Sequence, residues 1–318
     1  MDSFNRKLAQ GLMPALLIIA GACQSSPAED GTEQPQGTTS QPATKAPSQA
    51  KVQGYLIVNY EQSKVVRLDK DGLMVWQLQE LFYPSDAKML PNSNILIAEQ
   101  ADGAVREYSP DGDVIWEFRD LQRPRSAAPL ANGNVLIADP TGQRVIEVTR
   151  DKKVVWALSK RDFEDDYFRP FHAARLANGN SLVVDFGGKR VIEVNPAKKV
   201  VWKFDGQCID AERLPNGNTL MVQVDGSVRR PKQRNLIPPN LTLEEHLATT
   251  RYHFQAIEVD ASNRVVWKIE LEGYPYDADR LPNGNTLVAE EGGVRIYDRD
   301  GKIVRHVFKS WSYEADQL

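Results

Sequence analysis

A unit that recurs along the chain, with a fragment of the same unit at the C-terminus, constrains the fold more than any other feature. Five tryptophans each end a run similar to Val-Val-Trp, at spacings of 40, 40, 46 and 65 residues: Trp76, Trp116, Trp156, Trp202 and Trp267. A period near 40 is typical of propeller blades. The last six residues, 313–318, resemble the start of the preceding unit at 276–281, and the unit at 54–78 lacks that first strand. A ring closed by strands from both ends of the chain explains both observations.

Each unit contains the turn and strand signals of a four-stranded antiparallel sheet. Asn283-Gly284 separates two apolar runs, which is a strong hairpin signal because both residues tolerate positive φ. A third short run follows, and a fourth carries the tryptophan. We therefore predict an all-β fold, a six-bladed β-propeller. Its blades are expected at 54–78 plus 313–318, 86–118, 126–158, 172–204, 210–269 and 277–308.

The N-terminal 52 residues are predicted to form a secretory leader and a tether. In 1–22, Arg6 and Lys7 precede an apolar run too short to span a bilayer, which predicts a signal peptide. The run ends at Cys23 in a pattern that resembles the bacterial lipoprotein box, so we expect lipidation there. Ala20 departs from the usual residue of that box and leaves ordinary secretion as the alternative. Residues 23–52 are rich in Ser, Pro, Thr and Gln, which predicts a disordered tether.

These features predict a cell-envelope protein with one folded domain at 53–318. Gln24 after the cysteine is typical of outer-membrane lipoproteins that face the periplasm. Acylation of Cys23 leaves Cys208 as the only thiol, and a disulfide between the two is the alternative. The formal charge is −4, or −5 once Asp2, Arg6 and Lys7 are removed with the leader. This charge gives no indication of nucleic-acid binding, and we expect a monomer.

The repeats also predict a ring of polar side chains near the propeller axis. The first strand of a blade lies innermost, and the residue that opens it is Asp86, Ser126, His172, Asp210, Asp277 or Glu314. Alanine follows in all six blades, which fits strands crowded at an axis. A two-residue hairpin would place each ring residue opposite a second polar side chain, because the turn sets the register. The expected pairs are Asp86 with Glu99, Ser126 with Asp139, His172 with Asp185, Asp210 with Gln223, Asp277 with Glu290 and Glu314 near Asn59.

Carboxylates this close together raise one another's pKa unless a cation neutralises them. Oxygen ligands suit calcium, so Asp86, Asp210, Asp277 and Glu314 are a candidate Ca²⁺ site. The alternatives are a water-filled channel whose polar groups bond to backbone, or an organic ligand. A ligand would contact the ring together with Glu99, Asp139, Glu290, Tyr276 and Tyr313. No cofactor is certain.

One pair in this ring resembles catalytic machinery. His172 facing Asp185 could act in acid-base chemistry, with Arg125 and Arg169 in the loops of the same mouth to bind an anion. A hydrogen-bonded histidine without catalytic role is the alternative. The insertion 226–253 in the fifth blade carries four basic residues, and we expect it to be a lid over the channel mouth.

The unit Asp-Ala-x-Arg-Leu-Pro-Asn-Gly-Asn-Thr-Leu-Val-x-Glu, followed by Val-Ile-Glu-Val and Lys-Val-Val-Trp, resembles the repeats of bacterial PQQ-like propellers and of arylsulfotransferases. The resemblance covers 54–318. It implies a propeller, and for the arylsulfotransferases a channel histidine that accepts a sulfuryl group, a position matched by His172. The chain departs from that family in having one ring histidine and no large N-terminal domain. The PQQ-dehydrogenase signature is absent as well.

Two classes of function therefore remain open. We favour a lipid-anchored, non-enzymatic propeller that binds an envelope protein or a small anionic or aromatic ligand through its channel mouth. The alternatives are an arylsulfotransferase-like enzyme that uses His172, and a calcium-dependent lactonase or esterase.

Overall fold

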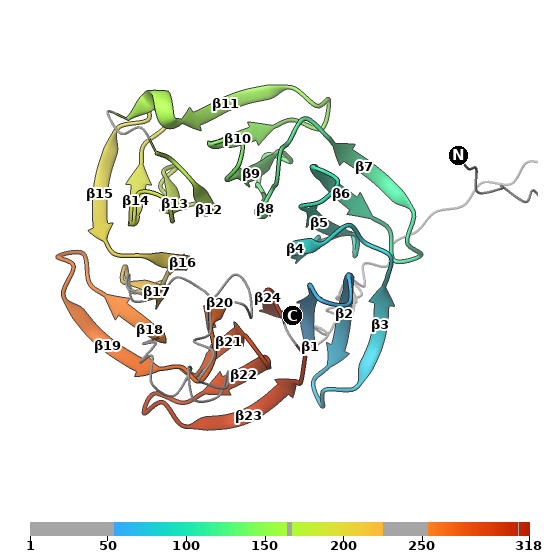
Figure 1. Ribbon diagram of the computed structural model, residues 1–318, viewed down its shortest axis with the longest axis vertical. Helices are drawn as coiled ribbons and strands as arrows, with labels where there is room; N and C mark the ends of the chain where they lie inside the picture. The colour runs from blue at the N-terminus through green and yellow to red at the C-terminus, as the bar shows by residue number, and fades with distance from the viewer. Residues whose placement is uncertain (1–53, 164–166, 225–253, 311) are drawn as a thin grey trace, which may run out of the picture. The chain divides into compact units, whose positions relative to one another are not determined.

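Six four-stranded antiparallel sheets stand around an axis as the blades of a propeller (Figure 1). The computed structural model describes residues 54–163, 167–224, 254–310 and 312–318. The predicted fold class and blade number are confirmed. The predicted leader 1–22, the lipidated Cys23, the tether 23–52 and the insertion 226–253 lie outside the described residues.

Each blade places its first strand innermost and its tryptophan-bearing strand outermost. The strands, from inner to outer, are as follows. Blade 1 has β24 (Glu314–Gln317), β1 (Gly54–Asn59), β2 (Lys64–Asp69) and β3 (Met74–Leu78). Blade 2 has β4 (Pro84–Met89), β5 (Ile95–Glu99), β6 (Ala104–Tyr108) and β7 (Val114–Phe118). Blade 3 has β8 (Ser126–Pro129), β9 (Val135–Asp139), β10 (Arg144–Val148) and β11 (Val154–Ser159).

Blades 4 to 6 follow the same order. Blade 4 has β12 (Pro170–Arg175), β13 (Ser181–Asp185), β14 (Arg190–Val194) and β15 (Val200–Asp205). Blade 5 has β16 (Cys208–Arg213), β17 (Thr219–Val224), β18 (Phe254–Val259) and β19 (Val265–Glu270). Blade 6 has β20 (Pro275–Arg280), β21 (Thr286–Glu290), β22 (Gly293–Tyr297) and β23 (Ile303–Phe308). A single 3-10 turn, η1 (Lys160–Asp162), follows β11. In the part of the chain that the structure covers, no helix is long and apolar enough to cross a membrane.

The C-terminal strand completes the first blade, as its sequence predicts. β24 pairs antiparallel with β1, with Ala315 opposite Ile57. Two further backbone bonds extend the pairing at its ends: Tyr313 N–H donates to Val58 O at 3.0 Å, and Leu318 N–H donates to Gly54 O at 2.9 Å. Figure 1 shows the C-terminus beside β1. The ring is therefore closed by hydrogen bonds between the two ends of the described chain.

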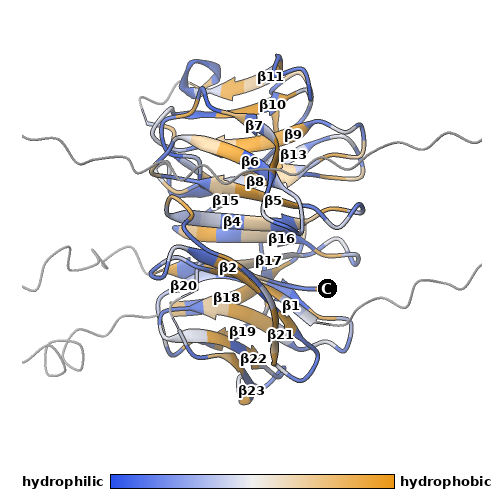
Figure 2. Ribbon diagram, turned by 90° about the vertical axis from the view of Figure 1, so that its right-hand side faces the viewer, coloured by the Kyte–Doolittle hydropathy of each residue, from blue (hydrophilic) through white to orange (hydrophobic). Residues whose placement is uncertain are grey.

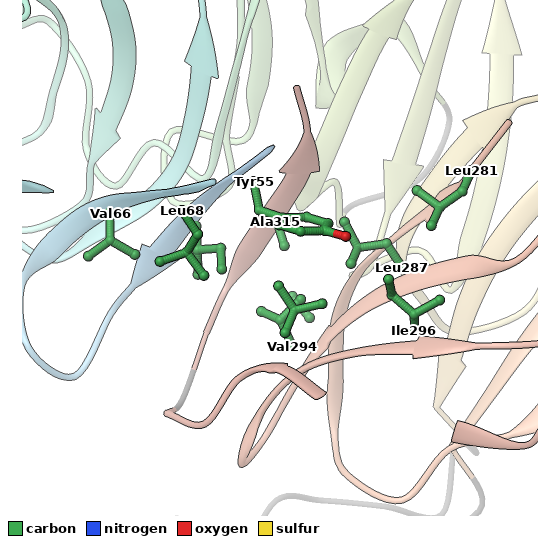
Figure 3. Close-up of a cluster of buried hydrophobic side chains, with 11 residues drawn as sticks. Tyr55, Val66, Leu68, Leu281, Leu287, Val294, Ile296 and Ala315 are labelled. Atoms are coloured by element: carbon green, nitrogen blue, oxygen red, sulfur yellow. The ribbon is translucent and has the colours of Figure 1, made fainter. Parts of the chain in front are cut away.

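The apolar core is divided among the interfaces between blades. Alternate strand residues point to opposite faces of a sheet, so each blade presents one apolar face to each neighbour. At the closure, Tyr55 and Leu68 of blade 1 pack with Leu287 and Val294 of blade 6 and with Ala315 (Figure 3). Hydrophobic residues occupy the strands and hydrophilic ones the turns at the edges of the sheets (Figure 2). This arrangement explains how a domain of this length folds without one central core.

The recurring tryptophans hold neighbouring blades together. In four blades the indole N–H donates to a carbonyl in the outer turn of the next blade: Trp76 to Pro110 O at 2.8 Å, Trp116 to Arg150 O at 2.8 Å, Trp156 to Pro196 O at 3.1 Å and Trp267 to Arg299 O at 2.7 Å. An indole N–H at a blade interface gains from an acceptor, and the turn supplies one in these four blades, whereas the buried Trp202 Nε1 has no acceptor among the described residues. The tryptophan that marks the repeat in the sequence is thus an inter-blade contact.

The hairpin register differs by one residue from the prediction. Leu130 N–H donates to Asn134 O at 2.8 Å and Gly133 N–H donates to Leu130 O at 2.9 Å, so the loop has three residues. Gly133 supplies the left-handed conformation with φ of 83° that ends such a loop. The prediction assumed a two-residue Asn-Gly turn. One residue of slip moves every side chain to the other face, so the predicted cross-strand pairs are wrong.

The observed neighbours of the ring residues are apolar. They are Ala98 opposite Asp86, Ala138 opposite Ser126, Val184 opposite His172, Val222 opposite Asp210, Ala289 opposite Asp277 and Val58 opposite Glu314. In blades 2, 4, 5 and 6 a bulge precedes the ring residue and places Glu99, Asp185, Gln223 and Glu290 opposite the first residue of the inner strand. The ring itself is unaffected, because it depends on the repeat and not on the turn.

Candidate functional site

The ring residues connect the innermost strands of successive blades. Asp86 Oδ2 accepts a hydrogen bond from Ala127 N–H at 2.7 Å, and Asp277 Oδ2 accepts one from Ala315 N–H at 3.3 Å. Ser126 Oγ accepts one from Ala173 N–H at 3.2 Å. In each case the donor is the alanine that follows the ring residue of the next blade. Buried polar groups require such partners, so these contacts fix the strands around the axis.

The alanine that follows each ring residue is buried in all six blades, with 0 to 1% of its surface exposed: Ala87, Ala127, Ala173, Ala211, Ala278 and Ala315. This burial agrees with the predicted crowding at the axis. A larger side chain here would separate adjacent blades.

Lys88 supplies the cation that the acidic ring requires. Its Nζ donates to Glu314 and, at 3.0 Å, to Asp316 Oδ1, and it lies 3.8 Å from Asp86 Oδ1. Lys88 follows Asp86 by two residues on the same strand, and period two places both on one face. The predicted ring comprised only the first position of each inner strand and therefore did not include Lys88. Extending it two residues along each strand would have found Lys88 together with Glu212, Asp279 and Asp316.

Burial dominates the titration of this acidic cluster. It raises the pKa of Glu314 to about 8, although Lys88 opposes the shift. Burial likewise raises the pKa of Asp277 and Asp279 well above the ordinary range, and neighbouring carboxyls add to it: Glu314 for Asp277, and Asp316 for Asp279. Desolvation disfavours the charged form, and like charges reinforce that effect. These groups hold protons at pH values where free carboxyls are ionised.

His172 forms an ion pair with Asp210, and not with the predicted Asp185. Its Nδ1 lies 2.6 Å from Asp210 Oδ1. Burial acts to lower the pKa of His172, but the Asp210 carboxylate outweighs it and the pKa is raised. Burial acts to raise the pKa of Asp210, and His172 holds it below its usual value. Each partner therefore favours the charged form of the other, imidazolium for His172 and carboxylate for Asp210.

Asp185 has a structural role. It is fully buried and accepts hydrogen bonds from Arg169 N–H at 2.9 Å, Gly188 N–H at 3.0 Å and Arg190 Nε at 2.9 Å. It thereby fixes the loop that enters blade 4. The register slip is the physical reason that Asp185 points away from His172.

The other predicted partners brace loops in the same way. Glu99 accepts from Tyr108 Oη at 2.5 Å and from Phe82 N–H at 2.9 Å. Asp139 accepts from Arg123 N–H at 3.0 Å, and Glu290 accepts from Tyr297 Oη and Gly273 N–H, both at 2.6 Å. All three carboxylates are fully buried. They belong to the connections between blades, so their predicted place beside the ring residues is wrong.

Tyrosine and arginine side chains lie next to the ring. Tyr313 stacks between Tyr60 and Tyr276, with ring centroids 4.2 and 4.3 Å apart. The Arg125 guanidinium lies 4.5 Å from the Phe171 centroid and 5.3 Å from that of Tyr313. Arg125 thus joins the aromatic groups of blades 1 and 4. Flat guanidinium and aromatic surfaces favour flat ligands.

Three arginines surround a small polar pocket beside these aromatic rings. The pocket has a volume of about 140 Å³ and is lined by Gln100, Arg123, Arg125, Pro140, Thr141, Arg169 and Phe171. The Arg123 guanidinium donates to the Gln100 side chain at 3.4 Å, and the Arg169 guanidinium donates to Tyr167 Oη at 3.3 Å. Within the residues that the structure describes, no carboxylate lies within 4.0 Å of any of the three guanidinium groups. We call these residues, with Tyr313, the arginine rim.

The candidate calcium ligands have other partners in this structure. Asp86 and Asp277 bind backbone N–H groups, Asp210 binds His172, and Glu314 binds Lys88. Among the described residues, no group of three or more His, Cys, Asp or Glu side chains is arranged to hold a metal ion. Calcium at this ring stays a prediction. Cys208 is buried, and burial raises the pKa of its thiol, so it is an unreactive core residue.

Comparisons with solved structures support the fold. A protein of unknown function from Bacteroides caccae is 18% identical, with a TM-score of 0.63 over 84% of this chain and 99% of that one. A streptogramin B lyase is 10% identical, with a TM-score of 0.56 over 83% and 82%. A candidate 6-phosphogluconolactonase from Bacteroides uniformis is 11% identical, with a TM-score of 0.55 over 84% and 99%. No protein-family model and no curated protein matches the chain. At these identities the likeness shows a β-propeller fold.

Proposed function

We propose that this protein is a non-enzymatic binding propeller of the bacterial cell envelope, and that its arginine rim binds a small anion that carries a flat ring. The single observation that carries the proposal is the set of three arginines that have no carboxylate partner among the described residues, next to the aromatic side chains of Phe171 and Tyr313. Each uncompensated guanidinium favours an anion, and its fork suits carboxylate, sulfate or phosphate oxygens.

The charges around the rim define the ligand further. Asp86, Asp277 and Glu314 lie on the ring, further along the inner strands, and they repel an anion when they are ionised. Phe171 and Tyr313 place aromatic surface beside Arg125, although their ring faces already contact other side chains. An anionic group between the arginines, with its ring against the edges of these aromatic side chains, contacts both the cationic and the aromatic surface. A neutral ring lacks the charge contacts, and a simple inorganic anion lacks the aromatic contact.

A binding measurement with 4-nitrophenyl sulfate tests this site. We expect calorimetry to detect binding that weakens at least about tenfold in Arg125→Gln and in Arg169→Gln, because each loses a charge-assisted hydrogen bond. Arg119→Gln is the matched control, since Arg119 is 56% exposed and paired with Glu117. Neutral 4-nitroanisole should bind much more weakly. Equal affinity for both compounds, or for wild type and Arg125→Gln, contradicts the proposal.

A second candidate is group transfer at His172. The 2.6 Å contact with Asp210 favours acid-base or transfer chemistry, since a carboxylate orients the imidazole. The raised pKa of His172 opposes the role of nucleophile, which requires a neutral ring nitrogen. Release of 4-nitrophenol from the same compound in the presence of a phenol acceptor, lost in His172→Ala, would favour the transferase over the binding protein.

The envelope location rests on the sequence of residues 1–52. Acylation of Cys23 would hold the propeller at the outer membrane through the tether 23–52. Incorporation of labelled palmitate, lost in Cys23→Ala, tests this part of the proposal. A mature protein that is unlabelled and found in the soluble periplasm supports ordinary secretion instead.

A further inference from the structure

Three of the blade interfaces contain the same arginine contact. In each, the last residue of an inner strand is an arginine that reaches back to the preceding blade. It binds a glutamate there and lies over a tryptophan: Arg175 with Glu147 and Trp156, Arg213 with Glu193 and Trp202, and Arg280 with Glu258 and Trp267. The guanidinium also donates to the glycine carbonyl of its own hairpin, at 3.1 Å in all three. We call this arrangement the arginine seat.

The interface between blades 2 and 3 has the seat without its arginine. Blade 2 supplies Glu107 and Trp116 as neighbours across strands β6 and β7, as the other blades do. The last residue of β8 is Pro129, where β12, β16 and β20 have arginine. A cavity of about 500 Å³ lies here, lined by Glu107, Pro129 and Gly133 among others. Proline has no side chain that reaches Glu107, which accounts for the cavity.

Glu107 is already bound on one side by Arg150, from the outer turn of blade 3, and Arg150 stacks on Trp116. This contact does not fill the seat. At the interface of blades 5 and 6, Arg299 is the equivalent turn residue and lies 3.1 Å from Glu258 while Arg280 occupies the seat. One glutamate thus accepts two guanidinium groups in this fold. The seat at Glu107 has room for a second one.

The cavity walls are complementary to the methylene chain of an arginine as well as to its guanidinium group. Leu90, Leu96, Leu130 and Val135 line it with apolar surface, and long cationic side chains bury their methylene stems along such surface. Glu107 is 3% exposed, so an ion pair with it is shielded from water. Lysine has one compact charge and lacks the planar fork, so it matches these acceptors less well.

We infer that the cavity between blades 2 and 3 binds an arginine side chain of a peptide partner. The guest guanidinium takes the place that Arg175, Arg213 and Arg280 hold in their interfaces, and contacts Glu107 and the carbonyl of Gly133. This site is formed by the hairpin turns, and its lining residues are distinct from those of the arginine rim. The inference therefore stands independently of the proposed function.

The binding of an arginine analogue tests this inference, with Pro129→Arg as a variant whose own side chain fills the seat. N-acetyl-L-arginine methylamide is titrated into the full-length protein, and its binding is followed by the NMR chemical shifts of the Trp116 indole. We expect saturable binding that is retained in Pro129→Ala and weakened at least about tenfold in Pro129→Arg and in Glu107→Gln. The Pro129→Arg variant should also melt at a higher temperature, because it completes the contact seen in three other interfaces.

Matched probes distinguish charge from shape. N-acetyl-L-citrulline methylamide has nearly the same shape without the charge, and the lysine analogue has the charge without the fork; both should bind at least about tenfold more weakly. Equal binding of citrulline and arginine contradicts recognition of the cation. Unchanged arginine binding in Pro129→Arg, in a variant that is folded and melts normally, shows that the compound binds elsewhere and overturns the inference.

Discussion

Replacing Glu314 by glutamine should stabilise the protein at alkaline pH. The pKa of Glu314 is raised from 4.5 to about 8 because burial disfavours its carboxylate. Between these values the unfolded chain has released a proton that the folded protein still holds, so the free energy of unfolding falls as pH rises. Each pH unit corresponds to about 1.4 kcal/mol, and the interval therefore amounts to about 5 kcal/mol. Glutamine keeps the size of the side chain and has no proton to lose.

We therefore expect Glu314→Gln to match wild type within about 1 kcal/mol near pH 5 and to exceed it by about 3 to 5 kcal/mol at pH 9. The lower bound allows for the charges of Asp86 and Asp316, which add to the shift of the Glu314 pKa. Urea unfolding followed by tryptophan fluorescence at pH 5, 7 and 9 measures the difference. Glu61→Gln, at an exposed turn position, is the control. A Glu314→Gln variant that is less stable than wild type at pH 9 refutes the reasoning and shows that the Lys88 contact outweighs burial.

Three further predictions follow from the ring. Lys88→Met should lower the free energy of unfolding by about 3 to 5 kcal/mol at pH 8, because Glu314 and Asp316 lose their cation, and by less at pH 5 where carboxyls take up protons; Lys70→Met at the surface is the control in urea unfolding. Deleting 313–318 removes the four β24–β1 pairs and should cost at least about 3 kcal/mol, so an unchanged Tm contradicts the closed ring. Asp210→Asn should lower the pKa of His172 in an NMR titration, whereas Asp185→Asn should leave that pKa unchanged and reduce stability; the reverse result restores the pairing expected from sequence.

The sequence predicted the fold because the repeat is redundant. The sequence of each blade contains the same strand and turn signals. The tryptophan period therefore predicted the number of blades, and the terminal fragment predicted the closure by β24. The ring positions followed from the alignment of units alone. They needed no knowledge of any single turn, and Asp86, His172 and Asp210 do lie on the inner strands of blades 2, 4 and 5.

The register between paired strands could not be predicted as reliably as the number of blades. It depends on whether the hairpin loop has two residues or three. Asn-Gly suits both a two-residue turn and the last two positions of a three-residue loop. The choice is visible at Ser93, which holds a φ of 68° in the glycine position of blade 2. The proline before the asparagine, at Pro91, is compatible with the type I turn that such a loop contains. Weighing that residue would have favoured the observed register, in which His172 lies opposite Val184 and not Asp185.

The same repeat places opposite charges at different depths along the inner strands. Arg125 precedes Ser126, whereas Asp279 and Asp316 follow their ring residues by two positions, so the Arg125 guanidinium lies at the rim and these carboxyls lie further along the strands. A ligand anion is attracted by the guanidinium groups of the rim and repelled by the ionised carboxyls of the interior. It is therefore expected to bind at Arg125 and Phe171. Protonation of Glu314 and Asp277 at lower pH removes part of the repulsion. Anion affinity should consequently rise as pH falls from 8 towards 6, where Glu314 takes up its proton and the free energy of unfolding rises. One set of buried acids thus connects ring stability with binding at the rim.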